Sequence, residues 1–196
     1  MIPIYDYHPA FVKIGPIRVT RREIKDIVKS WAAISLAFAI LMTGGHGTLG
    51  FVVVFLISGA TVGVGFIFHE LAHKMMAQRF GCFPEFIANT QMLVFAVFSA
   101  FLGFVFAAPG AVYISGPVGR RENGIISAAG PLANIVIALA FRLLPLGVIS
   151  AYGASINGWL AFFNLIPVMG FDGSKVWRWN KGIYALLIAI AAIMAF

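Results

Sequence analysis

Residues 50–77 read GFVVVFLISGATVGVGFIFHELAHKMMA, and this stretch decides the class of the protein. From Gly50 to Phe68 it contains no charged side chain and consists mainly of apolar residues. A helix needs about 20 apolar residues in succession to cross the hydrocarbon layer of a membrane. Residues 50–77 are therefore predicted to form a membrane-spanning helix that is long enough to protrude on one side.

The composition of the whole chain agrees with a membrane location. Hydrophobic residues make up 61% of the 196 residues and charged residues only 11%, against roughly 45–50% and about 25% in soluble domains. A soluble domain of this size leaves too much of its surface wet to hide so many apolar side chains. The single cysteine, Cys82, excludes a disulfide scaffold. The apolar composition also excludes a disordered chain and a nucleic-acid-binding domain, despite the net charge of +7.

Several apolar stretches are candidates for membrane segments. They cover residues 28–43, 50–77, 92–115, 125–146, 154–168 and 182–196. The third is broken at Ala108-Pro109-Gly110, and irregular backbone is tolerated inside a membrane only where protein or water covers it. We therefore expect residues 92–115 to form a re-entrant or hairpin element with an extended return limb over 111–115; an ordinary span is the alternative. The predicted fold is an all-α integral membrane protein with about five transmembrane helices plus this element.

The first 30 residues differ from the rest because they carry much of the positive charge. Residues 12–20 alternate polar and apolar side chains around Gly15-Pro16, a pattern that predicts a short β-hairpin. Residues 21–29 are expected to form a basic helix that lies on the membrane surface and contacts anionic headgroups. We therefore divide the chain into a basic membrane-surface segment, 1–30, and a polytopic membrane domain, 31–196, whose core covers 50–181.

The end of the second span carries His69-Glu70-Leu71-Ala72-His73, which points to bound metal. Ionisable groups inside a membrane helix are expensive and mark functional sites. Residues four apart lie on one face of a helix, so His69 and His73 can share one zinc ion. Glu70 is then placed to take a proton from a water held at the metal. A buried core histidine is the simpler interpretation of either histidine alone, but it does not explain both beside a carboxylate.

A catalytic zinc site usually has a third protein ligand besides two histidines. Of the other histidines, His8 lies in the amino-terminal tail and His46 in the turn after the first span. Asp172 stands out among the acids because it closes the fifth span, where a carboxylate needs a partner. Two interpretations of Asp172 stay open at this point: a zinc ligand, or a cap for a helix over 175–180. The acids outside the predicted spans are Asp6, Glu23, Asp26, Glu85 and Glu122.

Two motifs on separate predicted spans resemble those of the site-2 protease family of intramembrane zinc metalloproteases. They are His69-Glu70-Leu71-Ala72-His73 and the run Asn164-x-x-Pro167-x-x-x-x-Asp172-Gly173, with a similar Ala129-Gly130-Pro131-Leu132 between them. The resemblance covers residues 65–181. It implies that His69, His73 and Asp172 bind one zinc ion per chain, that Glu70 is the general base and that Asn164 helps to hold the substrate carbonyl or its oxyanion.

The resemblance further implies an enzyme that hydrolyses peptide bonds in or near transmembrane segments of membrane-protein substrates. Its partner would be a single-pass membrane protein or a peptide remnant of one, within the lipid bilayer. Two alternatives stay open. A zinc transporter or non-proteolytic zinc-binding membrane protein would use the same ligands without needing Glu70. Another membrane metalloprotease family would use a glutamate as third ligand, for which Glu85 and Glu122 are available.

The direction of the spans follows from the proposed ligands. His69 and His73 lie near the carboxyl end of the second span and Asp172 at the carboxyl end of the fifth, so both spans must run in the same direction. A re-entrant 92–115 provides the odd number of crossings that this requires. The positive-inside rule then places residues 1–27, 78–124 and 171–181 in the cytoplasm. We expect a multi-pass protein of the cell membrane whose amino terminus and active-site side are cytoplasmic.

Asn134 lies in the middle of the fourth predicted span. Amide side chains in membrane helices hydrogen-bond to neighbouring helices, and we expect this role for Asn134 rather than one in a water path. Cys82 follows the metal-bearing helix and is expected to be a small buried side chain.

Overall fold

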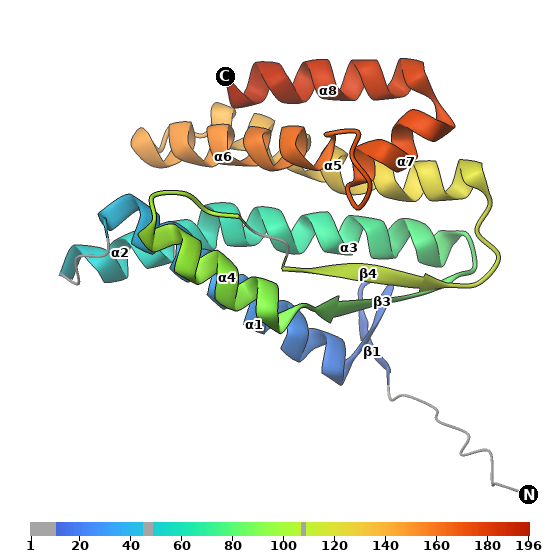
Figure 1. Cartoon of the computed structure of the whole chain (residues 1–196), viewed down its shortest axis with the longest axis horizontal. Coiled ribbons are helices and arrows are strands. Elements are labelled where there is room, and N and C mark those ends of the chain that lie inside the picture. The colour runs from blue at the N-terminus through green and yellow to red at the C-terminus, as the bar shows by residue number, and fades with distance from the viewer. Residues whose placement is uncertain (1–10, 45–48, 107–108) are drawn as a thin grey trace, which may run out of the picture.

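A computed structural model of the chain describes residues 11–44, 49–106 and 109–196 (Figure 1). His8 and His46 lie outside these residues. The described elements in chain order are β1 (Phe11–Ile14), β2 (Ile17–Thr20), α1 (Arg21–Thr43), α2 (Leu49–Ser58), the π-helical turn η1 (Gly59–Gly63), α3 (Val64–Arg79), β3 (Phe83–Ala88), α4 (Thr90–Phe101), β4 (Gly110–Ser115), α5 (Arg120–Leu143), α6 (Val148–Asn164), α7 (Asp172–Trp179) and α8 (Lys181–Ala195).

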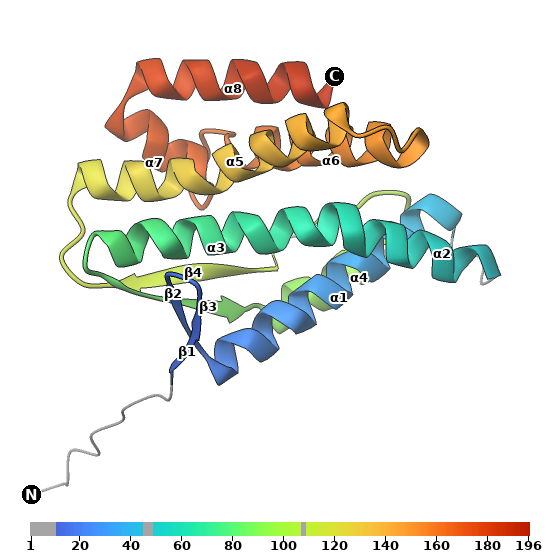
Figure 2. The ribbon, with the colours of Figure 1, turned by 180° about the vertical axis from the view of Figure 1, so that it is seen from behind.

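Helix α3 lies in the middle of the molecule, between two layers (Figures 1 and 2). On one side it packs against α5, which contacts α6 and α7, and α8 covers α6 from outside. On the other side lie α1, α4 and the two-stranded sheet of β3 and β4. The helix that carries the two histidines is therefore enclosed by the rest of the fold.

Three helical segments are long and apolar enough to cross a membrane: Arg21–Thr43, Gly50–Arg79 and Arg120–Leu143. The second consists of α2, η1 and α3. These apolar helices indicate that the protein associates with a membrane. The segments expected as the fifth and last spans form α6 and α8, which have 17 and 15 residues, so the five spans stay a prediction.

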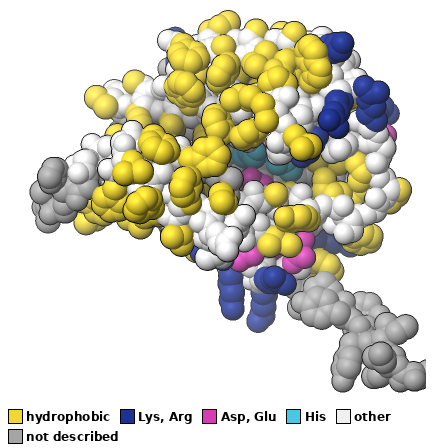
Figure 3. Space-filling model, in the orientation of Figure 1, with side chains coloured by type: hydrophobic (Ala, Val, Ile, Leu, Met, Phe, Trp, Pro, Cys, Tyr) yellow, Lys and Arg dark blue, Asp and Glu magenta, His cyan; other side chains and the backbone are white. Residues whose placement is uncertain are grey.

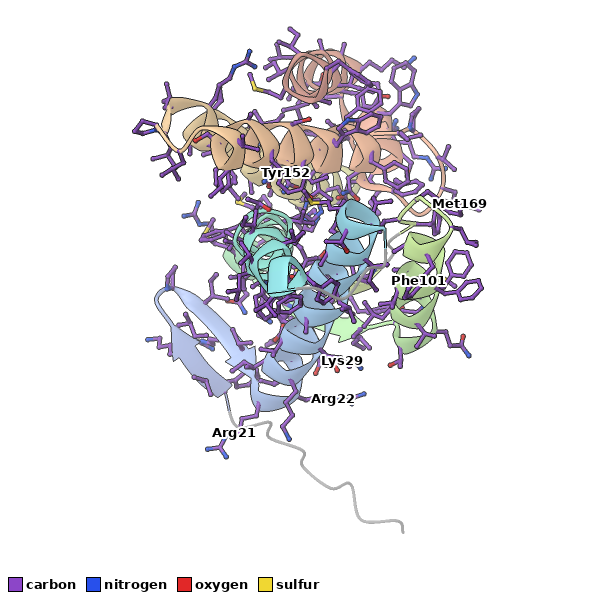
Figure 4. All side chains as sticks on the ribbon, turned by 90° about the vertical axis from the view of Figure 1, so that its left-hand side faces the viewer. Arg21, Arg22, Lys29, Phe101, Tyr152 and Met169 are labelled. Atoms are coloured by element: carbon purple, nitrogen blue, oxygen red, sulfur yellow. The ribbon has the colours of Figure 1, made fainter. Side chains whose placement is uncertain are left out.

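The surface supports this association. Large apolar side chains of several helices are exposed, among them Leu56, Phe101, Val136 and Ile193. Figure 3 shows apolar side chains spread over one face of the molecule, with the Lys and Arg side chains visible there gathered near its edges. Arg21, Arg22 and Lys29 lie in the amino-terminal part of α1, at the bottom of Figure 4, and Phe101 at the end of α4 lies above them.

The amino-terminal hairpin is present as the sequence predicts. β1 and β2 pair in antiparallel register from Phe11 opposite Thr20 to Ile14 opposite Ile17. Thr20 then begins α1 with a capping box, because its hydroxyl accepts from the Glu23 amide and the Glu23 carboxylate accepts from the Thr20 amide. One expectation needs correction: the basic segment 21–29 and the first predicted span are one continuous helix, because residues 21–43 contain neither Gly nor Pro.

The stretch 92–115 doubles back. The chain leaves the sheet at Ala88 and returns at Gly110, its partner in the register, and β4 then runs antiparallel to β3 as far as Ser115 opposite Phe83. Between them α4 has only 12 residues. The expected hairpin form and its extended return limb are confirmed, and the alternative of an ordinary span is wrong. The expectation of an all-α membrane fold is also incomplete, because the sequence analysis did not predict strand β3.

A buried ion pair ties this sheet to α1 and α3. The Lys74 ammonium on α3 lies 2.8 Å from a carboxylate oxygen of Glu23, and the two residues are 2% and 0% exposed. Lys74 also donates to the carbonyl of Pro84, and Glu23 accepts from the amide of Phe86. Both charges thus have hydrogen-bonding partners, as buried charges need, and β3 is held at a fixed place beside α3.

The π-helical turn η1 interrupts the long helix that ends in α3. Such turns free backbone carbonyls from the regular ladder, and here two side chains from other helices reach these carbonyls. The indole of Trp31 on α1 donates to Gly59 O over 3.1 Å. The amide of Asn157 on α6 donates to Thr61 O over 3.4 Å. Cys82, after α3, is buried and free, as expected.

Candidate metal centre

His69, His73 and Asp172 meet at one point between α3 and α7. The Nε2 atoms of the two histidines are 3.0 Å apart. A carboxylate oxygen of Asp172, Oδ2, lies 3.3 Å from Nε2 of His69 and 3.0 Å from Nε2 of His73. All three residues are buried. In the part of the chain that the structure describes, these three form the one group of His, Cys, Asp and Glu side chains able to hold a metal ion.

The opposite ring nitrogen of each histidine is engaged in a hydrogen bond. Nδ1 of His73 lies 2.7 Å from the carbonyl oxygen of Ile126 on α5. Because a carbonyl can only accept, this Nδ1 carries a proton, and Nε2 is the ring nitrogen that faces His69 and Asp172. Nδ1 of His69 lies 2.7 Å from the side-chain oxygen of Asn134, also on α5. Metal-bound histidines usually donate their second N–H in this way.

Asp172 points its carboxylate at the histidines. The other carboxylate oxygen lies 3.7 Å from the Lys175 ammonium. Phe171 occupies the N-cap of α7, and among the described residues no backbone amide donates to Asp172. The Asp172 side chain therefore does not serve as a helix cap.

The donor set fits zinc. Two imidazole lone pairs and a carboxylate oxygen converge, and such acceptors repel one another unless a cation lies between them. Tetrahedral zinc with bonds of about 2.0–2.1 Å would hold its ligand atoms about 3.3 Å apart, close to the observed separations of 3.0–3.3 Å. Two nitrogens and one oxygen are also ligands that zinc accepts. With three ligands from the protein, a bound zinc ion would keep a fourth position for water or substrate.

A glycine of α5 allows this close packing. The backbone of Gly130 passes so near the imidazoles that an added Cβ would lie 2.4 Å from Nε2 of His73 and 2.7 Å from Cε1 of His69. Any other residue at this position would intrude on the metal centre.

Glu70 and Asn164 lie at the same cavities as the metal centre. Glu70 is 8% exposed, and within the described part of the chain its carboxylate accepts no hydrogen bond. Asn164 ends α6 and donates from Nδ2 to the carbonyl of Leu160 over 2.9 Å. Both side chains line two adjoining cavities. The structure brings them together with the three ligands, while their roles stay predictions.

The two cavities differ in size and lining. The larger measures about 430 Å³ and is mainly apolar, with Phe38, Phe66, Trp159 and Phe163 in its wall. The smaller measures about 110 Å³ and contains the three candidate ligands together with Lys175. Figure 3 shows histidine and acidic side chains at the bottom of an opening between the apolar side chains of the surface.

Strand β4 borders the smaller cavity with Gly110, Ala111, Val112 and Ile114. Its partner β3 occupies one edge of β4, and the sheet has two strands. Among the described elements, the other edge of β4 is not paired with a strand. An edge strand offers backbone N–H and C=O groups to an added chain.

The alternative third ligands do not reach the centre. Glu85 lies on β3 and Glu122 in the first turn of α5, and neither belongs to the group that could hold a metal. The alternative of a protease with a glutamate as third ligand had rested on Glu85 and Glu122, and it therefore loses its support. A zinc transporter with the same three ligands is not addressed by the geometry.

Sequence reasoning identified the role of Asn134 only in part. Its expected hydrogen bonds across helices are confirmed, since it reaches Gly65 O on α3 and Asn157 on α6. The contact with His69 was not predicted, nor was any role for Asn157. For both Asn134 and Asn157, the sequence feature that could have indicated a role is an amide side chain in the middle of an apolar helix.

Comparison with known proteins gives one informative match. No protein-family model matches the sequence, and no solved structure matches it. The chain is 38% identical over 180 residues to a protein of Methanocaldococcus jannaschii named "Putative zinc metalloprotease MJ0611". The match covers 87% of this chain and 91% of the archaeal protein. The chain therefore belongs to the zinc metalloprotease family of this Methanocaldococcus jannaschii protein.

Proposed function

We propose that the protein is an intramembrane zinc metalloprotease of the site-2 protease type, which hydrolyses peptide bonds in or near transmembrane segments of other membrane proteins. The observation that carries the proposal is the convergence of His69, His73 and Asp172 within an apolar helical fold, with Glu70 beside them. The name of the archaeal relative supports the reaction type. The apolar helices support the location.

Each polar side chain has a distinct task in this proposal. Zinc held by the three ligands would polarise the scissile carbonyl and make the attacking water more acidic. The Glu70 carboxylate accepts the proton of that water and delivers it to the leaving amine. Asn164 uses one N–H of Nδ2 for Leu160 O, and its second N–H is available to donate to the oxyanion.

The cavities suggest how a substrate binds. A helix hides its carbonyls in its own hydrogen bonds, so the substrate must be unwound before hydrolysis. The larger cavity offers apolar walls for side chains of a transmembrane segment. The free edge of β4 offers backbone groups to the unwound part as an added strand. Together they would place a scissile bond between Glu70 and Asn164, which line both cavities.

The decisive experiment separates proteolysis from zinc binding. Glu70→Gln removes the proton acceptor but none of the three ligands, so we expect wild-type zinc content and no cleavage of a single-pass membrane substrate reconstituted in the same vesicles. Glu85→Gln, on β3, serves as the matched control and should cleave normally. Cleavage by Glu70→Gln would refute the mechanism. Zinc binding without cleavage by the wild type would favour a transporter or a non-proteolytic zinc protein.

We also propose that the metal centre faces the cytoplasm of a multi-pass protein in the cell membrane. In a Cys82→Ala background, Gly116→Cys and Ser174→Cys should both react with a membrane-impermeant thiol reagent from the cytoplasmic side. Leu143→Cys, at the opposite end of α5, should react from outside. Labelling of the first two from opposite sides would contradict this topology.

A further inference from the structure

Two asparagine side chains stand in a row behind His69, away from the metal centre. Asn157 on α6 contacts Asn134 on α5 over 3.2 Å, and Asn134 contacts Nδ1 of His69 on α3 over 2.7 Å. Both asparagines are 0% exposed. The row thus crosses three helices and connects the metal centre to the π-helical turn.

The direction of every hydrogen bond in the row follows from backbone carbonyls, which can only accept. Asn157 donates to Gly153 O over 2.9 Å and to Thr61 O over 3.4 Å, so its oxygen faces Asn134. Asn134 must therefore present its NH₂ group to Asn157. The same NH₂ group donates to Gly65 O over 3.1 Å.

The remaining atom of the row is the side-chain oxygen of Asn134, which faces His69. An oxygen only accepts, so Nδ1 of His69 must carry a proton. Rotating the Asn134 amide by half a turn would bring its oxygen against Gly65 O and the oxygen of Asn157. At side chains that are fully buried, two such contacts between acceptors are unfavourable, because buried polar groups need partners.

We propose that Asn157 and Asn134 are positioning residues that fix the neutral tautomer of His69 with the proton on Nδ1. Nε2 then keeps the lone pair that faces Nε2 of His73 and Oδ2 of Asp172. A neutral imidazole has one N–H, so the tautomer decides whether Nε2 can bind a metal. An amide performs here what a carboxylate does behind many metal-bound histidines, and it adds no charge to an apolar interior.

The tautomer can be read directly by ¹⁵N NMR of histidine-labelled, zinc-free protein in detergent. The chain has four histidines, and the His69 signals are assigned by their loss in His69→Gln. In the wild type we expect the pattern of a protonated Nδ1. In Asn134→Leu the proton should shift to Nε2, and zinc affinity in a chelator competition should fall by about 10–100-fold.

Two further variants test the row itself. Asn134→Asp keeps an acceptor toward His69 and should retain the Nδ1-protonated pattern. Asn157→Leu leaves the Asn134–His69 contact intact but removes the group that orients Asn134, so it should yield a mixture of tautomers and a smaller loss of zinc affinity. Ile135→Ala is the control, because it empties a buried position next to Asn134 without touching the row; it should lower stability and leave the tautomer unchanged.

An unchanged His69 pattern in either leucine variant, with helicity retained, would refute the proposal. The same shift in Ile135→Ala would also refute it, since the cause would then be general loosening. The inference rests on the metal site of the proposed function and not on peptide hydrolysis. Because the tautomer is read without zinc or substrate, its failure and a failure of the proposed function are separate results.

Discussion

Replacing Gly130 by alanine should remove zinc while the fold persists. An added Cβ would lie 2.4 Å from Nε2 of His73 and 2.7 Å from Cε1 of His69, where ordinary contacts begin at 3.4 Å. The backbone of α5 and the imidazoles must therefore separate by about 1 Å, because atoms this close overlap. The His73 Nδ1 bond to Ile126 O, now 2.7 Å, would then exceed the hydrogen-bond range of about 3.2 Å.

The magnitude follows from two opposing effects on the fold and one on the metal. Overpacking costs about 1–3 kcal/mol, but alanine favours a helix over glycine by about 1 kcal/mol. The net loss of folding free energy should therefore stay below about 2 kcal/mol. Loss of the bonds that orient the histidines should weaken zinc binding by at least 10–100-fold, as loss of such partners typically does.

The assay is zinc content after dialysis against a chelator of known affinity, with helicity measured by circular dichroism on the same samples. Gly158→Ala is the matched control, because its Cβ would lie 2.4 Å from the backbone of Met194 on α8, far in sequence from the metal ligands. It should lose stability and keep its zinc. Wild-type zinc affinity in a folded Gly130→Ala variant would refute the steric reasoning.

Two further predictions concern charged side chains. Asp172→Ala removes the anionic member of the three candidate ligands and should lose zinc in the same chelator assay. The control is Lys175→Ala, which removes the ammonium 3.7 Å from Asp172 and should keep its zinc. Zinc retained in Asp172→Ala would show that the third ligand lies elsewhere. Lys74→Met leaves the Glu23 carboxylate buried without its cation and should lower the free energy of unfolding by about 3–5 kcal/mol. The double variant Lys74→Met with Glu23→Gln should recover part of this loss in denaturant unfolding, and equal stability of Lys74→Met and wild type would show that the pair contributes little.

The parts of the structure that local sequence determines were predicted best. The spacing of His69 and His73 needs only one helical turn to bring them together. Gly15-Pro16 marks the turn of the first hairpin, and Pro109-Gly110 marks the point where β4 begins. Asp172 needed the resemblance, because its partners lie in a distant helix and an isolated Asp before a helix is equally typical of a cap. The sequence alone left that choice open, and the fold brings the carboxylate to the histidines.

Features that depend on long-range packing were missed for a physical reason. Glu23 and Lys74 each look like a solvated charge near the end of a helix, and only the fold reveals that they neutralise each other in the interior. Strand β3 begins Phe83-Pro84, which reads as a loop until β4 supplies its partner. Asn157 resembled any other small polar residue of a membrane helix. Two of its partners are backbone carbonyls, which every residue has, so no side-chain type in the sequence marks them.

The π-helical turn between α2 and α3 has a consequence for comparing relatives. A π turn accommodates one residue more than the α-helix it interrupts, and each residue of an α-helix advances the helix by about 100° and 1.5 Å. Deleting one residue from 59–63 would therefore restore regular winding while α2 kept nearly the same face relative to α3, because the π turn absorbs the extra residue. The carbonyls of Gly59 and Thr61 would then return to the regular ladder and lose the bonds from Trp31 and Asn157. A one-residue gap at 59–63 in an alignment of relatives would thus mark the loss of this turn and of its two contacts, and not an error of alignment.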